Sequence, residues 1–467
     1  MTIASGAVMI QEKEAGSGES RRAIWGWAVY DWANSAFTTT VMAVFFPILY
    51  KQYWSHGIDV NLSTFRLGVG NAAASLIVAL MAPVVGAAAD SGGHRKQLLI
   101  GFTYLGVLLT AALALVPQGQ WFLAIVIYAV GVIGFSGSVV FYDALLPWVA
   151  PPRRLDQVSS LGYGLGYLGG GLLLALNVAM TLKPGLFGLA DSVQAIRAAF
   201  VSVALWWGLF ALLTFIWVPS DAGTGHAPLS RQLAAGLRKV KATLGKIRQL
   251  RTLFTFLLAY WCYIDGVDTI IRMAVDFGMS IGFETNDLII ALLITQFVGF
   301  PAAILYGLLG RRWGVKRAIY LALAVYMAVT VWGAFMRRPV EFYVLAAVIG
   351  LVQGGIQALS RSYYARLIPP DSCAEFFGFY NMLGKFAAIA GPVLMGLTGL
   401  IAKRILLPPS PSAEQIHAAG LLATRTSIIS VLLLFFAGAV LFYLVDEDKG
   451  KAELAGQAAA GPAITGA

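Results

Sequence analysis

The sequence has little charge for its length. Charged residues make up 12% of its 467 residues, whereas a soluble domain carries roughly a quarter. Hydrophobic residues make up 58%, so the chain cannot cover its own surface against water. Lipid must therefore be its solvent. Its spans must be closed helices or a closed barrel, because backbone polar groups need partners within the hydrocarbon.

Cysteine and histidine are also scarce. Cys262 and Cys373 have no metal-like spacing and give no disulfide framework. The four histidines all fall in predicted loops: His56, His94, His226 and His417. We therefore expect no metal centre, no bound cofactor and no acyl-transfer base in the membrane, which argues against an intramembrane enzyme.

Long apolar runs take the place of the missing charge. Barrel strands alternate apolar and polar residues, but these runs are continuous and have the length of about 20 residues that a membrane-crossing helix needs. We predict an all-α polytopic membrane protein with twelve transmembrane helices and both termini on one side. The expected spans are 22–50, 64–90, 97–116, 121–148, 155–181, 194–218, 252–277, 286–309, 316–336, 341–367, 374–402 and 419–445.

The basic residues are placed unevenly, and they explain the net charge of +10. Lys and Arg concentrate in the predicted loops on the side that holds the termini. This bias predicts cytoplasmic termini in a bacterial-type inner or plasma membrane, and it removes most of the case for nucleic acid. The resulting segments are a disordered region 1–20, a six-helix bundle 21–218, a cytoplasmic linker 219–251, a second bundle 252–446 and a disordered tail 447–467.

The linker carries seven basic and no acidic residues between Leu229 and Arg251. Its apolar residues recur at spacings of three and four, which favours one helix face. They are Leu229, Leu233, Leu237, Val240, Leu244, Ile247 and Leu250. We favour a helix on anionic lipid headgroups that joins the two bundles; the alternative is a solvated basic linker.

Two turns repeat. Gly86-Ala-Ala-Ala-Asp90-Ser-Gly-Gly93-His-Arg95-Lys96 follows span two, and Gly307-Leu-Leu-Gly-Arg311-Arg312-Trp-Gly314-Val-Lys316-Arg317 follows span eight. The offset is 307 − 86 = 221 and 314 − 93 = 221. Each has a glycine where a tight turn needs positive φ. The repeat indicates duplication of a six-span unit, one of the known transporter designs.

The first turn resembles the loop 2–3 motif of the major facilitator superfamily, Gly-x-x-x-Asp-Arg/Lys-x-Gly-Arg-Arg, but departs from it at Ser91 and His94. The second copy has Arg311 where Asp would stand. Two further segments resemble the vacuole-effluxer branch: Tyr30-Asp31-Trp32-Ala33-Asn34-Ser35-Ala36-Phe37 and Gly355-Ile-Gln357-Ala-Leu-Ser360-Arg361-Ser362. The resemblance implies the major facilitator fold of two pseudo-symmetric six-helix bundles. It also implies a relationship to fungal proteins that release amino acids from the vacuole.

The same resemblance implies a cytoplasmic gate. Its residues would be Gly86, Asp90, Gly93, Arg95, Arg312 and Gly314. Asp90, Arg95 and Arg312 would lock the cytoplasmic side while the cavity opens outward. The alternative role for Asp90 is to cap the N-terminus of a neighbouring helix.

Ionisable residues deep in a span are costly and usually face a cavity or a partner. Span seven has the most: Asp265, Asp268, Arg272 and Asp276 are spaced by 3, 4 and 4 and share one helix stripe. Arg272 can pair with Asp268, which leaves Asp265 less neutralised. This stripe predicts a charged cavity wall, or alternatively an ion-pair ladder that fixes helix register.

Span one carries Asp31 and Asn34 on one stripe. In the superfamily, spans one, four, seven and ten line the cavity, which implies that Asp31, Asp143, the span-seven group and Arg361 meet there. Further candidates are Gln357, one turn before Arg361, and Lys385 in span eleven. Lys385 follows Gly384, but no Ser or Thr comes next, so we reject a phosphate-binding loop.

These residues predict a secondary active transporter of a small polar solute such as an amino acid, working by alternating access with proton coupling. Arg361 or Arg272 would clamp a substrate carboxylate, and Asp31 or Asp265 would hold an ammonium. We expect a monomer. One alternative is a proton-independent facilitator or exporter of a sugar, peptide or drug. Another is a transport-inactive receptor or assembly factor.

Overall fold

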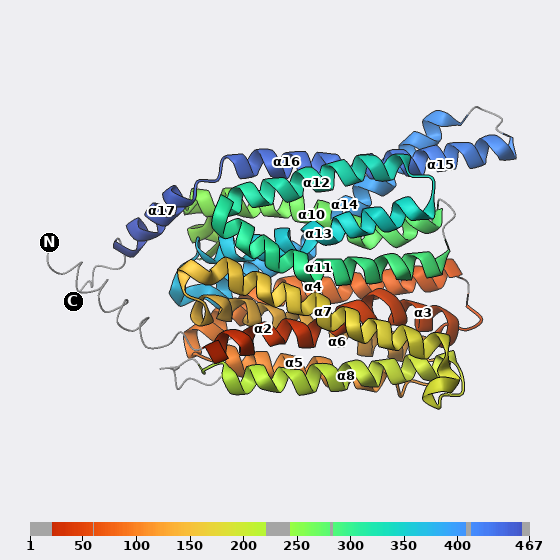
Figure 1. Ribbon diagram of the computed structural model, residues 1–467, viewed down its shortest axis with the longest axis horizontal. Helices are drawn as coiled ribbons and strands as arrows, with labels where there is room; N and C mark the ends of the chain where they lie inside the picture. Colours follow the sequence, from red (N-terminus) through yellow and green to blue (C-terminus); the bar gives the residue numbers. More distant parts are fainter. Residues whose placement is uncertain (1–20, 59, 221–242, 281–283, 408–411, 460–467) are drawn as a thin grey trace.

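The computed structural model describes residues 21–58, 60–220, 243–280, 284–407 and 412–459. The segment 1–20 and linker residues 221–242 lie outside this part. Twelve of the described helices are long and apolar enough to cross a membrane, which confirms the predicted number. They lie side by side as one bundle of helices (Figure 1).

We call the first six spans the N-half and the last six the C-half. The N-half comprises α2 (Arg21–Ala36) with its continuation, α4 (Val60–Gly92), α5 (Arg95–Leu113), α6 (Trp121–Val149), α7 (Leu155–Leu182) and α8 (Ser192–Trp217). The C-half comprises α10 (Arg251–Ser280), α11 (Thr285–Trp313), α12 (Val315–Phe335), α13 (Pro339–Ala365), α14 (Cys373–Leu406), α15 (Ala413–Ile429) and α16 (Leu432–Tyr443). The end of the bundle where α2 begins and α16 ends is called the terminal end (Figure 1).

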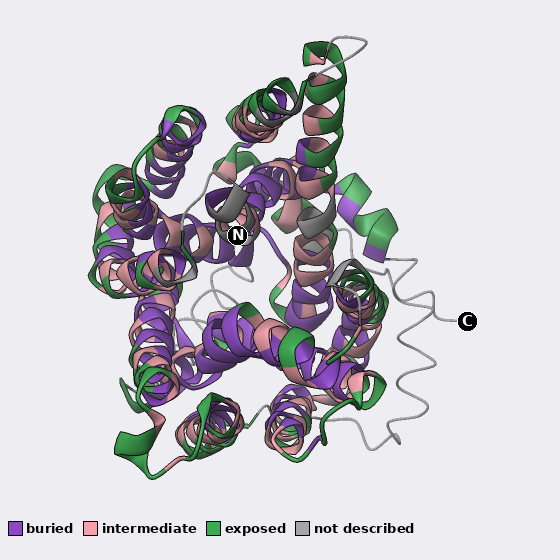
Figure 2. Cartoon of the chain, turned by 90° about the vertical axis from the view of Figure 1, so that its right-hand side faces the viewer, coloured by how far each residue is buried: buried purple, intermediate pink, exposed green. Residues whose placement is uncertain are grey.

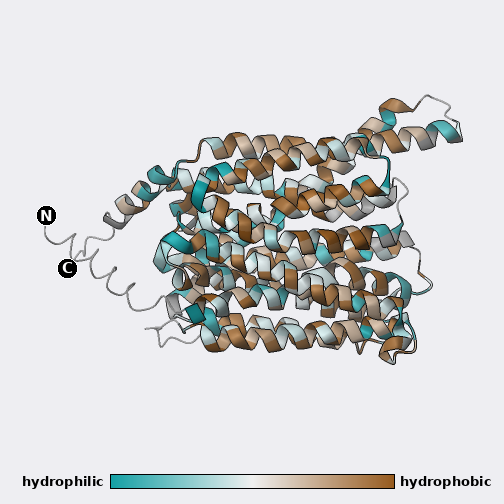
Figure 3. Ribbon diagram, in the orientation of Figure 1, coloured by the Kyte–Doolittle hydropathy of each residue, from teal (hydrophilic) through white to brown (hydrophobic). Residues whose placement is uncertain are grey.

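The outer surface of the bundle is apolar. Leu80, Leu209 and Phe436 are each more than 60% exposed, and exposed residues face outward around the bundle while buried ones face inward (Figure 2). Apolar residues run along the helices, and polar ones gather towards their ends (Figure 3). This distribution suits a protein whose sides are solvated by lipid.

Span one changes its winding half-way. After α2 it continues as a π-helix over η1 (Phe37–Phe45), a short α3 (Phe46–Leu49) and a second π segment, η2 (Tyr50–Trp54). The change coincides with Thr38 and Thr39, whose hydroxyls both donate to the Ser35 carbonyl at 2.9 and 3.0 Å. Such hydroxyls compete for the carbonyl that the backbone would use, which locally widens the helix.

The two halves are related by a second constant sequence offset, in addition to the offset of the repeated turns. Spans four and ten are each followed by a Pro-initiated 3-10 turn, η3 (Pro152–Arg154) and η5 (Pro370–Ser372). The offset is 370 − 152 = 218, and it persists into the helices that follow, α7 at Leu155 and α14 at Cys373. Gly93 and Gly314 have φ of +64° and +90°, which confirms the predicted positive φ in both repeated turns.

The predicted disordered tail is wrong for most of its length, because residues Glu447–Ala459 form a helix, α17. Its first turn carries Glu447 and Asp448, which suit the positive end of the helix dipole. The Glu453 carboxylate accepts hydrogen bonds from the Thr252 amide and hydroxyl, both at 3.1 Å. These contacts anchor the tail to the start of span seven. Residues 460–467 lie outside the described part.

Candidate functional site

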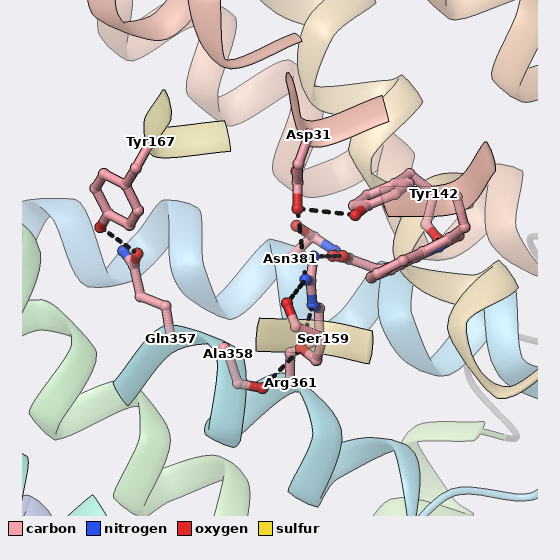
Figure 4. Close-up of polar contacts among 10 residues, drawn as sticks. Asp31, Tyr142, Ser159, Tyr167, Gln357, Ala358, Arg361 and Asn381 are labelled. Carbon is pink, nitrogen blue, oxygen red and sulfur yellow. Dashed lines mark hydrogen bonds and ion pairs between the residues drawn. The ribbon is translucent and has the colours of Figure 1, made fainter. Parts of the chain in front are cut away.

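Arg361 is the centre of a buried polar cluster between the halves. It lies on α13, and its Nη1 donates to Asp143 Oδ1 at 3.0 Å. Its Nη2 donates to the Ser159 carbonyl at 2.9 Å and lies 3.5 Å from Asp31 Oδ2. Its Nε donates to Ser159 Oγ at 2.9 Å (Figure 4). One C-half arginine thus binds three N-half residues.

Three aromatic rings surround the same guanidinium. Its carbon lies 4.3 Å from the ring centre of Tyr163, 4.9 Å from that of Trp27 and 5.3 Å from that of Tyr142. Trp27 and Tyr142 stack with centroids 4.3 Å apart. Cations are attracted to aromatic faces at such distances, most strongly when water is excluded. The Arg361 side chain is only 3% exposed.

Each carboxylate of the cluster has a second, neutral partner. The Tyr142 hydroxyl donates to Asp31 Oδ2 at 2.8 Å. Asn381 on α14 donates from Nδ2 to Asp143 Oδ2 at 3.1 Å (Figure 4). These bonds satisfy acceptors that burial would otherwise leave empty, a condition for a buried ion pair to be tolerated.

The two carboxylates are not equivalent. Asp143 is 5% exposed and lies 3.0 Å from Arg361, whereas Asp31 is 13% exposed and lies 3.5 Å away. Two carboxylates share one guanidinium, so the cluster has one negative charge in excess when both are ionised. Asp31 is the carboxylate that is less tightly paired and more accessible, which makes it the better acceptor for a proton or an ammonium group.

The ion pair between Asp143 and Arg361 has the same sequence offset as the two Pro-initiated turns. Asp143 and Arg361 are separated by 361 − 143 = 218, so they occupy equivalent positions in spans four and ten. Their supports, Tyr163 beside Arg361 and Asn381 beside Asp143, are also 381 − 163 = 218 apart. Opposite charges at equivalent positions therefore meet where the halves face each other. The resemblance implied that Asp143 and Arg361 meet, but their equivalent positions at an offset of 218 were not recognised from the sequence.

Further contacts join the halves near the terminal end. The Asp156 carboxylate on α7 binds Arg366 at 2.6 Å and accepts from the Ser362 hydroxyl at 2.6 Å. Asp156, Ser159 and Asn381 were not among the residues predicted from the sequence. Asp156 and Ser159 follow η3 and Asn381 follows η5, so the shared register of these two turns was the signal that could have found them.

Asp90 caps a helix of the other half, which is the alternative role considered for it. It pairs with Arg95 at 2.7 Å, and its carboxylate accepts from the Ala374 and Glu375 amides at 3.1 and 2.8 Å. These amides open α14, so an N-half acid caps a C-half helix. Arg312 is exposed and makes none of the inter-half contacts found among the described residues.

The first glycine of each repeated turn lies at a close helix crossing. A Cβ on Gly86 would lie 2.7 Å from the Ala374 carbonyl carbon, and one on Gly307 would lie 3.2 Å from the Asp156 carbonyl oxygen and 2.7 Å from Ser160 Cβ. Ala374 and Asp156 are again 374 − 156 = 218 apart. Glycine therefore allows α4 to touch α14 and α11 to touch α7 near the terminal end.

We expect Gly86→Val to prevent closure of the terminal end. The side chain would collide with backbone atoms of α14, which cannot rotate away, so the cost falls on the closed state. Uptake into liposomes should fall to background. The matched control is Gly68→Val on the same helix, where an added Cβ has nothing within 4 Å. Equal uptake by both variants would contradict the role of this crossing.

Asp265 is held inside the C-half. It is 1% exposed, and its Oδ1 accepts from the Gly391 amide at 2.9 Å and from the Thr269 hydroxyl at 3.4 Å. Gly391 precedes Pro392, which breaks the helical hydrogen-bond pattern of α14. Asp265 therefore joins α10 to α14 at this point, and it is not a contact of Arg361.

The remaining candidates are more scattered. Asp268 is half-buried on α10. Gln357 Oε1 lies 3.5 Å from the Tyr167 hydroxyl across the halves (Figure 4). Asn34 is buried, and its Nδ2 has no hydrogen-bond partner in the described part of the chain. Lys385 is half-buried on α14, and the side chain of Arg272 lies outside the described residues.

A family model described as vacuole effluxer Atg22 like matches residues 19–65 and 56–401. The chain belongs to this family. A relative named as an uncharacterised MFS-type transporter, YxiO of Bacillus subtilis, is 38% identical over 90% of this chain and 94% of its own length. Autophagy-related protein 22 of Coccidioides immitis is 23% identical over 83% of this chain and 85% of its own.

The fold comparison agrees with this family. The human organic anion transporter MFSD10 superposes with a TM-score of 0.63 at 17% identity, covering 90% of this chain and 99% of that one. The chain therefore has the major facilitator fold. YxiO and MFSD10 are named as transporters, in agreement with the prediction of a transporter rather than an enzyme, and the vacuole-effluxer segments identified the correct branch.

Proposed function

We propose that this Atg22-like protein is a secondary active transporter of a small polar solute, an amino acid or a similar metabolite, coupled to protons. The observation that carries the proposal is the cluster of Asp31, Asp143 and Arg361 between the halves. Buried charge of this kind is costly in a membrane protein, and a static scaffold could dispense with it.

The cluster supports an alternating-access cycle. Arg361, Arg366 and the α14 amides all bind N-half carboxylates near the terminal end. With these bonds made, the halves are held together at that end. The cycle requires them to break together, so that the halves rock apart there. We place the terminal end in the cytoplasm on the distribution of Lys and Arg.

Asp31 is the proposed coupling carboxylate. It is the weaker of the two partners of Arg361, and it retains a hydrogen bond from Tyr142 whether or not it is charged. A proton on Asp31 would remove the excess negative charge of the cluster. A substrate ammonium would do the same, so both ligands act on one group. Polar groups near the interface, Gln357 and Tyr167, would hydrogen-bond the rest of the solute.

Two further expectations belong to the proposal. The basic segment 229–251 binds anionic headgroups. The structure describes residues 243–251 of this segment, and residues 243–249 are helical. The protein works as a monomer, because each chain contains both halves of the cavity. Neither expectation is needed for the transport cycle itself.

The test is uptake by purified protein in liposomes against a panel of amino acids, dipeptides and sugars. We expect at least one small polar solute to accumulate when a pH gradient is imposed, and a protonophore to collapse that accumulation. Liposomes with Arg361→Ala protein supply the background. Equilibration without accumulation for every transported solute would contradict proton coupling, and no transport of any solute would contradict the function.

A further inference from the structure

Every contact of the Arg361 guanidinium described above is made to the N-half. The partners come from α2, α6 and α7, and none belongs to the half that carries the arginine. They are Trp27, Asp31, Tyr142, Asp143, Ser159 and Tyr163. The N-half thus supplies all the described contacts of a guanidinium, although the guanidinium itself belongs to the C-half.

The chemistry of this surface matches one ligand class. A planar guanidinium directs several N–H donors outward in its plane and stacks on aromatic rings. The surface offers two carboxylates, a hydroxyl and a carbonyl as acceptors, with aromatic rings around them. An ammonium group would use the carboxylates but could not reach all the acceptors at once.

The N-half holds most of this surface in place without help from Arg361. The Trp27 indole N–H donates to the Tyr142 carbonyl at 2.8 Å, and the two rings stack. The Tyr142 hydroxyl binds Asp31 at 2.8 Å. Trp27 and Tyr142 are fully buried. Their geometry is therefore set by α2 and α6, and it should persist when α13 withdraws.

We propose that these six residues form a guanidinium cage, a binding site for a guanidinium-bearing solute that competes with Arg361. The ligand enters when the halves part at the terminal end, a step that rests on the proposed alternating-access cycle. An occupied cage cannot receive Arg361, so the ligand holds the protein open at that end. Such a solute inhibits transport from the terminal side.

The binding test uses purified Arg361→Ala protein, in which the cage lacks its internal guanidinium. Methylguanidinium at low millimolar concentrations is the probe, and methylurea is its uncharged control of similar shape. We expect saturable binding of methylguanidinium by calorimetry, with a matching rise in melting temperature. Adding Asp143→Asn removes one charged acceptor and should weaken that binding roughly tenfold or more.

The competition test uses wild-type protein. Spin labels at positions 153 and 371, which are exposed in the turns η3 and η5, report the distance between the halves at the terminal end. Cys262 and Cys373 are replaced by alanine in this background. We expect methylguanidinium to increase the fraction of long distances, and methylurea to leave it unchanged.

A folded, monodisperse Arg361→Ala protein that treats methylguanidinium and methylurea alike would overturn the cage. Binding to that variant without any change of distance in wild-type protein would overturn the competition with Arg361. Neither experiment measures transport. A failure to transport any solute would therefore refute the proposed function and leave the cage intact, so the two failures can be told apart.

Discussion

Arg361→Ala should abolish transport and leave the halves apart at the terminal end. The substitution leaves Asp143 and Asp31 buried in the closed state without their cation. Breaking a buried pair by removing one partner costs about 3–5 kcal/mol, which corresponds to a shift of roughly 10²-fold or more in the closed–open equilibrium. Initial uptake rates in liposomes measure the effect.

Three further variants serve as controls for this prediction. Arg312→Ala removes an arginine that is exposed on α11, and uptake should stay near wild type. Arg361→Lys keeps the charge but cannot bind Asp143, Asp31 and Ser159 together, so it should retain a small part of the activity. Adding Asp143→Asn to Arg361→Ala should restore closure in part, because it removes an unpaired charge. We call the contacts of Arg361 with Asp31, Asp143 and Ser159 the latch, because they join the halves. Normal transport by Arg361→Ala would refute its role.

Asp31→Asn should uncouple transport from protons. Asparagine keeps the shape of the side chain and an oxygen that accepts from Tyr142, but it cannot take up a proton. The solute should then equilibrate without accumulating when a pH gradient is imposed. A pH-sensitive dye inside the liposomes should show loss of substrate-driven proton movement, whereas counterflow of labelled solute should persist.

Asp265→Asn serves as the comparison for Asp31→Asn. Asp265 is bound to the Gly391 amide within the C-half, and an asparagine oxygen can accept the same bond. We expect this variant to keep its pH-driven accumulation. If Asp31→Asn also keeps it, the coupling site lies elsewhere.

The fold could be predicted from sequence because its signals are local. Each span is a continuous apolar run bounded by charge or turn residues, and lipid leaves such a run few options other than a helix. The glycines at 93 and 314 signalled positive φ by residue type alone. The tail was misjudged since its Ala- and Gly-rich composition hides Glu453, whose contacts with Thr252 stabilise α17.

The site was predicted only in part. Asp31, Asp143 and Arg361 were identified from the cost of burying charge, but their pairing depends on how the two halves dock. Span seven has the densest charge, which favoured it as the binding wall. The structure places Asp265 in a contact between α10 and α14, and the side chains of Arg272 and Asp276 lie outside the described residues. A stripe on one helix does not reveal which neighbour it faces.

The distance between positions 153 and 371 tests the central claim most directly, because it reports on the latch without relying on a known substrate. The labelled protein is measured in lipid nanodiscs with Arg361 intact and with Arg361→Ala. The latch predicts mainly short distances in the first sample and mainly long distances in the second. The same distribution in both would show that the Arg361 cluster does not hold the halves together.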